Sequence, residues 1–184
     1  MTSILKVNQI QTTAGGVPTA ADLGLNVTGT VLQVVQAFKS DIWSSSSTSY
    51  VDVTGLSITI TPSSANSKIY IAAYLGRVSN SGSSYYSNAW RFTRGSTAIG
   101  VGDAAGNRLL AGMNTHHYDG NYDGTGAMFY LDNPSTTSPV TYKVQGAGHG
   151  SGTVLLNYSE SNYDVNLGYG SRTGSNLIAM EIAG

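Results

Sequence analysis

The fold of this chain is decided by residues 90–108, WRFTRGSTAIGVGDAAGNR. Its alternating side chains predict one strand up to Thr93 and a second from Thr97 to Val101, with a tight turn at Arg94-Gly95-Ser96. The glycine-rich stretch that follows predicts a polar loop. The segment is therefore typical of an all-β domain, and its apolar side chains are predicted to be core or interface residues of a hairpin.

Strand patterns continue on both sides of this hairpin. Apolar residues alternate with Ser and Thr from Leu56 to Thr61, which predicts a half-buried antiparallel strand. Residues 31–36 carry apolar side chains on both faces and predict a central strand, and the run Leu177–Ile182, apolar apart from Glu181, predicts a final strand inside a sheet. We expect an antiparallel β-sandwich of jelly-roll type, with further strands at residues 89–93, 97–101, 127–131, 140–145, 153–158 and 176–182.

Residues 1–28 differ from the rest of the chain. They contain a short apolar patch and then a stretch of Gly and Pro that breaks any regular element. A frayed terminus is one interpretation. The other, which we favour, is an extended N-terminal docking arm ahead of a sandwich domain at residues 29–184, with an apolar anchor made by Ile4, Leu5, Val7 and Ile10.

The composition excludes several classes of function. Only 10% of the 184 residues are charged, the net charge is −1, and no basic run is present, so nucleic-acid binding is not expected. The chain has no cysteine for disulfides or thiolate metal sites. It also has no apolar run long enough to cross a membrane and no signal-peptide pattern, which predicts synthesis and retention in the cytoplasm until assembly.

The strand from Lys68 carries an unusual outer face. Ile69, Ile71 and Leu75 fall on the predicted core side, whereas Tyr70 and Tyr74 fall on the other side without a charge between them. Tyr is favoured at interfaces because it buries a wide ring and keeps a hydroxyl for hydrogen bonding. We predict that Tyr70 and Tyr74 lie at a subunit interface. An ordinary exposed strand, or one covered by a crossing loop, is the alternative.

No pattern of a metal or catalytic site is convincing. His116 and His117 are adjacent, so on an extended segment they point to opposite faces and cannot easily bind one ion. The Asp119–Gly124 loop lacks ligands that an EF-hand requires. There is no nucleophile elbow, and the glycines at residues 100–106 are not followed by a helix. We therefore predict no metal, no cofactor and no enzyme, although carboxylates could pair in space among Asp103, Asp119, Asp123, Asp132 and Asp164.

Three long, neutral loops at residues 80–88, 114–126 and 159–174 are rich in Tyr, Ser, Gly and Asn. Antibody loops use the same residues because they combine rigid contact area with adaptable hydrogen bonding. The alternative is that these loops are merely solubilising. If they bind a receptor, the candidate residues are Tyr85, Tyr86, His116, His117, Tyr118, Tyr122, Tyr163 and Tyr169.

Several phrases occur in an order that resembles small tail-fibre-like and other virion structural proteins of tailed phages of aquatic bacteria. They lie at residues 4–11, 14–24, 29–35 and 60–69 and in the opening hairpin, and so cover roughly the first 110 residues. The resemblance implies a homotrimeric, jelly-roll-like head on the virion, joined to other virion proteins by the arm. It places Tyr70 and Tyr74 near the threefold axis and the loops at the rim.

Two functions follow from this resemblance. The first is a short tail fibre or spike that binds a host surface glycan through its loops. The second is a head decoration protein that stabilises the capsid without a receptor. An enzyme acting on host polysaccharide is third.

Overall fold

The computed structural model describes residues 15–16, 28–81, 86–117, 123–148, 152–159 and 161–184, with only the backbone described at Tyr86 and His117. This part of the chain is built of β-strands, and its one helix is a 3₁₀ turn, η1 (Gly168–Gly170). The all-β prediction is confirmed. The strands are β1 (Val31–Lys39), β2 (Trp43–Ser45), β3 (Val51–Ile60), β4 (Lys68–Ser81), β5 (Tyr86–Arg94), β6 (Thr97–Ile99), β7 (Met113–His117), β8 (Gly124–Asp132), β9 (Val140–Ala147), β10 (Thr153–Leu156) and β11 (Ser175–Ile182).

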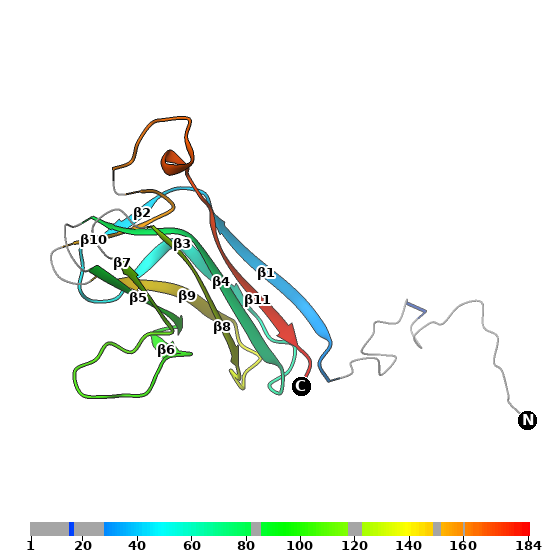
Figure 1. The fold of residues 1–184 in the computed structure, drawn as a ribbon. Helices are drawn as coiled ribbons and strands as arrows, with labels where there is room; N and C mark the ends of the chain where they lie inside the picture. Colours follow the sequence, from blue (N-terminus) through cyan, green and yellow to red (C-terminus); the bar gives the residue numbers. More distant parts are fainter. Residues whose placement is uncertain (1–14, 17–27, 82–85, 118–122, 149–151, 160) are drawn as a thin grey trace, which may run out of the picture.

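The strands form two curled antiparallel sheets (Figure 1). Sheet A contains the order β1-β11-β4-β8, with β10 and β2 beside the far end of β4. Sheet B contains β3-β9-β5, with β6 and β7 both paired to β5. Without the short strands β2, β6 and β10, the chain visits the two sheets in the order of a double Greek key. The jelly-roll prediction is therefore confirmed by the strand order itself.

A continuous core lies between the sheets. β4 contributes Ile69, Ile71 and Leu75, all fully buried, as its alternating pattern predicts. On sheet B, Trp90 and Phe92 point inward, and Trp90 packs on Trp43 with ring centroids 6.0 Å apart. Burying one large apolar side chain contributes about 1.5–3 kcal/mol, so this interior is the main source of stability.

The hairpin that decides the fold class is present as predicted. β5 and β6 pair with Phe92 opposite Ile99 and Arg94 opposite Thr97. Gly95 has φ +59°, a conformation that few other residues adopt at low cost, and its N–H donates to the Thr141 carbonyl at 2.8 Å. The turn is thus also fixed to the neighbouring strand β9.

Two strand predictions need correction. β1 is an edge strand of sheet A, not a central one, because among the described strands it pairs only with β11. The apolar side chains on its outer face are exposed. β7 was not predicted at all, since the sequence places Met113–His117 largely within a loop. By contrast, β11 lies between β1 and β4, as its two-sided apolar pattern predicts.

The sandwich has two distinct ends. β11 runs from the segment containing η1 to the C-terminus, and β1 runs beside it in the opposite direction (Figure 1). The chain enters β1 beside the C-terminal end of β11, where Gly29 N–H donates to Ala183 O and Ala183 N–H donates to Thr30 O, both at 2.8 Å. We call this the entry end. The opposite end, where β4 ends and β5, β8 and β11 begin, is the loop end.

The predicted arm falls almost wholly outside the described residues. Ile4, Leu5, Val7 and Ile10 belong to that part of the chain. Its proposed boundary at residue 28 adjoins the entry end of the sandwich.

Candidate functional surfaces

Arg77 joins two of the predicted receptor loops at the loop end. Its Nη2 forms an ion pair with Asp123, which immediately precedes β8. Its Nη1 donates to the carbonyl of Tyr169 at 2.9 Å, and its backbone N–H donates to Thr173 Oγ1 at 2.8 Å. The segments that approach β8 and β11 are therefore held together by one side chain from β4.

Three of the receptor candidates can be placed fully. Tyr163 and Tyr169 are each 53% exposed and meet edge to face with ring centroids 5.5 Å apart. His116 is exposed on β7, opposite Ser87 of β5. Tyr86 and His117 pair through their backbones, but their side chains are outside the described part, as are the residues Tyr85, Tyr118 and Tyr122.

The outer face of sheet A is an apolar surface. In the register of β8, β4, β11 and β1, Phe129 lies beside Ala72, which lies beside Ile178. Phe38 and Phe129 are 65% and 64% exposed, far more than aromatic rings usually are. The charged outward position in this register is Lys68, opposite Ile182 at the entry end. The other described outward positions are uncharged: Val34, Gln36, Phe38, Tyr70, Ala72, Tyr74, Ala127, Phe129, Leu131, Asn176, Ile178 and Met180.

The two predicted interface tyrosines lie on this apolar face. Tyr74 is 44% exposed, whereas Tyr70 is half-buried because its ring stacks on Phe129, with centroids 6.5 Å apart. Sequence reasoning found these two residues but missed Phe38, Phe129 and Leu131. The signal was available, because residues 127–131 are apolar on both faces of the predicted strand.

The outer face of sheet B is polar and internally paired. Asp52 on β3 accepts hydrogen bonds from Lys143 Nζ and Gln145 Nε2, each at 2.7 Å. These two donors hold the pKa of Asp52 below its usual range. Gln145 Oε1 in turn accepts from Arg91 Nε at 2.9 Å, and the Arg91 guanidinium lies 3.8 Å from the centroid of the Tyr50 ring.

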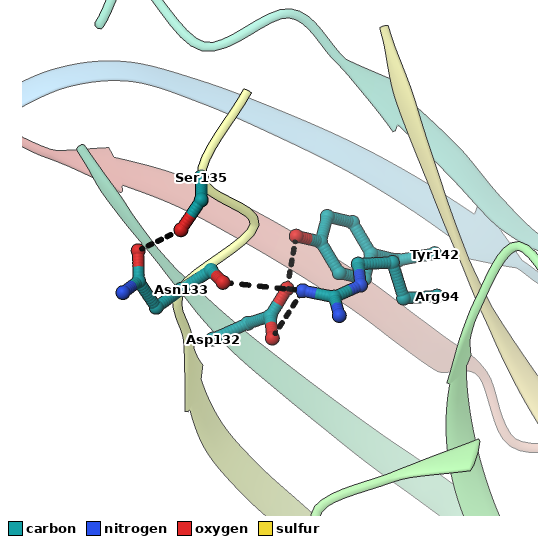
Figure 2. Close-up of polar contacts among 5 residues, drawn as sticks. All are labelled: Arg94, Asp132, Asn133, Ser135 and Tyr142. Carbon is teal, nitrogen blue, oxygen red and sulfur yellow. Dashed lines mark hydrogen bonds and ion pairs between the residues drawn. The ribbon is translucent and has the colours of Figure 1, made fainter. Parts of the chain in front are cut away.

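A buried polar cluster joins the two sheets between β8 and β9 (Figure 2). Arg94 Nη1 donates to both carboxylate oxygens of Asp132 at 3.1 Å and to the carbonyl of Asn133 at 3.2 Å, while the Tyr142 hydroxyl donates to Asp132 Oδ2 at 2.7 Å. Burial, and then the hydrogen bond to Asp132, raise the pKa of Tyr142, so its hydroxyl stays protonated and donates. In the figure, Ser135 contacts only the Asn133 side chain, at the margin of the cluster.

Two of the five aspartates that were considered as possible catalytic carboxylates form ion pairs with arginines. Asp132 pairs with Arg94 and Asp123 with Arg77. Within the described ranges, no group of three or more His, Asp or Glu side chains is arranged to hold a metal ion. In the same ranges, no helix is long and apolar enough to span a bilayer.

Glu181 is a second buried carboxylate, on the inner side of β11. It accepts hydrogen bonds from the Ser63 N–H at 2.7 Å, the Ser63 hydroxyl at 2.6 Å and Gln33 Nε2 at 2.5 Å. Burial raises the pKa of this carboxyl group, but the hydrogen bonds from Ser63 and Gln33 outweigh that effect and hold the pKa below its usual range. Through these hydrogen bonds, Glu181 links β1 and the β3–β4 connection to β11, an inner strand of sheet A.

Comparison with known proteins assigns no family. No family model matches the chain, and no curated protein does. Among solved structures, it is similar to the infectious bursal disease virus Gx strain structure, at 15% identity and a TM-score of 0.38, and to the VP2 subviral particle of that virus, at 14% and 0.37. Each match covers 83% of this chain and only 38% of the other. With scores and identities this low, the likenesses assign neither family nor role.

Proposed function

We propose that this chain is a phage virion structural protein, a short trimeric tail fibre or spike that binds a host surface glycan through its loops. The observation that carries the proposal is the difference between the two ends of the sandwich. The segment of the proposed docking arm enters at Gly29 beside Ala183, whereas Tyr163, Tyr169 and the Arg77 junction lie at the other end of β11. A protein that anchors at one end and contacts a surface at the other needs this arrangement.

The apolar face of sheet A supports the trimeric state. Four neighbouring strands over about five residues cover roughly 300 Å² in plan, the size of the largest apolar patch on a typical monomer, which is often functional. We propose that Tyr70 and Tyr74 meet their symmetry mates on this face, together with Phe129. The apolar face lies along the side of the sandwich, between the entry end and the loop end. We therefore expect a trimer formed through this face to leave both ends accessible.

Localisation on the particle is the first test. Gold-labelled antibodies against the purified chain should mark a few copies at the tail of particles whose genome encodes it. Labelling over the whole shell would replace the fibre proposal with the alternative, a head decoration protein with no receptor. Particles that carry no label at all would contradict a virion role of either kind.

Adsorption separates receptor binding from a purely structural role. The purified protein should bind host cells and should compete with the intact phage for adsorption. Removing the cell-surface polysaccharide from the host should abolish this binding. Protein that is present at the tail tip yet leaves adsorption unchanged would contradict the receptor role.

The arm has its own test. A chain lacking residues 1–28 should fold to the same sandwich, because every residue of the described core follows residue 28, but should no longer join the virion. A full-length variant with Leu5→Asp and Val7→Asp is the matched control for the loss of the apolar anchor alone. Normal incorporation of both variants would overturn the docking role.

We also propose that the chain is not an enzyme. Incubation with host polysaccharide should leave the length distribution of the polymer unchanged. Shortened chains would overturn this proposal, and substitution of the exposed Asp103 or Asp164 would then be the next step.

A further inference from the structure

The outer face of sheet B contains a hollow of about 340 Å³ close to the loop end. Its floor is made by Ala89 of β5 and by Ala147 and Gly148 at the end of β9. Ala89 lies directly opposite Ala147, so two small side chains meet where larger ones would fill the space. The size lies at the lower end of the range for small-molecule sites, about 300–1,000 Å³.

One wall of the hollow is a segment fixed onto the sheet. Residues 108–111 pass over β5, and the Leu110 carbonyl accepts a hydrogen bond from the Tyr50 hydroxyl at 2.9 Å. Directly after it, Gly112 N–H donates to the Trp90 carbonyl at 2.9 Å. Tyr50 is itself held by its contact with Arg91. The wall is therefore attached at two points, and the hollow is a built feature of the sheet.

Polar groups of two kinds line this hollow. Ser87 and Asn114 supply a neutral hydroxyl and a neutral amide from adjacent strands. Arg108 supplies the only positive charge among the lining residues described, and its Nη1 donates to the Ala105 carbonyl at 3.0 Å. A carbonyl is a neutral acceptor, so this bond leaves the charge of the guanidinium uncompensated. The exposed Leu109 adds an apolar edge.

From this arrangement we infer that the hollow binds an acidic sugar residue, such as a uronic acid. An arginine binds carboxylates through paired N–H donors. The hydroxyl of Ser87 and the amide of Asn114 match sugar hydroxyls, and the alanine floor matches the apolar face of a sugar ring. His116 is one step further along the same face, opposite Ser87, and would flank the bound residue. The inference rests on the proposed function, because it names the glycan class that the protein would bind.

The test uses the full-length protein and free glucuronic acid, with binding followed by ligand-observed and protein-observed NMR. Binding in the millimolar range is expected, with chemical shift changes at Ala89, Asn114 and Ala147. Glucose should bind at least tenfold more weakly because it lacks the carboxylate. Acetate should also bind at least tenfold more weakly because it lacks the ring. Equal affinity for acetate would mean that only the charge is recognised, which overturns the sugar assignment.

Two kinds of variant locate the site. Arg108→Gln should weaken glucuronate binding at least tenfold, whereas Lys68→Gln, which removes an exposed positive charge from the start of β4, should not change it. Ala89→Val and, at an exposed position, Asn114→Leu should each obstruct the hollow. Thermal unfolding identifies any variant that fails to fold. Unchanged binding in a folded Arg108→Gln or Asn114→Leu variant would overturn the inference.

Failure of this inference can be told apart from failure of the proposed function. If the wild-type protein adsorbs to host cells and Arg108→Gln adsorbs equally well, the receptor role stands and this site does not. If the wild-type protein does not adsorb while glucuronate still binds at the hollow, the site stands and the receptor role does not.

Discussion

The outer faces of the two sheets come from the same sandwich and have opposite chemistry. On sheet B, charged and polar side chains satisfy one another, as in the series from Lys143 through Asp52 to Arg91. On sheet A, the corresponding face carries Phe38, Phe129 and Tyr74, and Lys68 at the entry end is the charged residue among its described outward positions. A face with internally paired polar groups is stable in water by itself, whereas an apolar face of this size gains free energy only when something covers it. The difference agrees with the proposed arrangement, in which sheet A contacts other subunits and sheet B stays open to solvent and ligand.

The largest effect is expected when charges are placed on sheet A. Phe38→Lys combined with Phe129→Lys should convert the proposed trimer to monomers, because like charges brought together at an interface cost several kcal/mol. We expect the dissociation constant to rise on the order of a thousandfold, measured by sedimentation velocity. Both side chains are largely exposed within one subunit, so the unfolding free energy should change little.

The matched control for that pair adds the same charge to sheet B. Thr54→Lys with Ser57→Lys uses exposed positions of β3. This variant should remain trimeric. If both double variants dissociate, net charge and not the apolar face of sheet A governs assembly.

The next effect is expected at the Arg94–Asp132–Tyr142 cluster, which joins sheet A to sheet B. Asp132→Asn should lower the unfolding free energy by about 1.5–3 kcal/mol, because the buried Tyr142 hydroxyl and the Arg94 guanidinium, which is one-third exposed, both lose a charged acceptor. Urea unfolding measures this loss. A loss below about 1 kcal/mol would show that Arg94 finds other partners, for instance the Asn133 carbonyl.

The buried carboxylate of Glu181, on β11 of sheet A, should make the free energy of unfolding depend on pH. Its pKa is lower in the folded chain than its ordinary value of 4.5, so the carboxylate stabilises the fold above about pH 4.5. That contribution is lost as the pH falls from there through the folded pKa. Glu181→Gln should cost about 2 kcal/mol at pH 7, because hydrogen bonds to a charged group contribute about 1.5–3 kcal/mol. The difference from wild type should shrink as the pH falls below about 4.5, and a difference that is constant with pH would refute the assignment.

The smallest effect is expected on sheet B. Asp52→Asn removes an ion pair with a half-exposed carboxylate, and such pairs contribute about 0.2–1 kcal/mol. The loss should disappear in molar salt, where charges are screened. This substitution is chemically identical to Asp132→Asn, so the two measured together compare an exposed carboxylate with a buried one directly.

The sequence predicts local structure well where a pattern has one cause. The alternation of Ile69 with Tyr70 has one explanation, a strand with a buried side and an open side, and β4 has this form. The turn at Gly95 is equally local. Residues 31–36 were misplaced because apolar side chains on both faces reflect what lies above and below a strand, and not whether a second strand pairs with its other edge; β1 pairs only with β11 among the described strands. β7 was missed because Asn114 and His116 give it a polar outer side and Met113 and Thr115 give it a short inner side.

The candidate surfaces depend on contacts that no local pattern encodes. The face of sheet A combines β1 with β8, which are distant in sequence and are separated in the sheet by β11 and β4. Arg94 and Asp132 meet because β5 and β8, which belong to different sheets, both end at the entry end of the sandwich. The hollow over Ala89 requires the segment at residues 108–111 to return across β5, and the identity of small residues on a strand gives no sign of it.

The pairing of β1 with β11 also determines how the protein would respond to mechanical force. Residues Gln33–Lys39 and Ser175–Glu181 are in continuous antiparallel register, and tension applied through the N-terminal segment would enter at Gly29 along the axis of β1. If the opposing pull acts at the loop end, the two strands are loaded in shear, so the hydrogen bonds between them share the load and do not open one after another. A subunit tethered at one end and attached to a cell at the other would thus resist detachment best along its own long axis, and far less when it is pulled sideways.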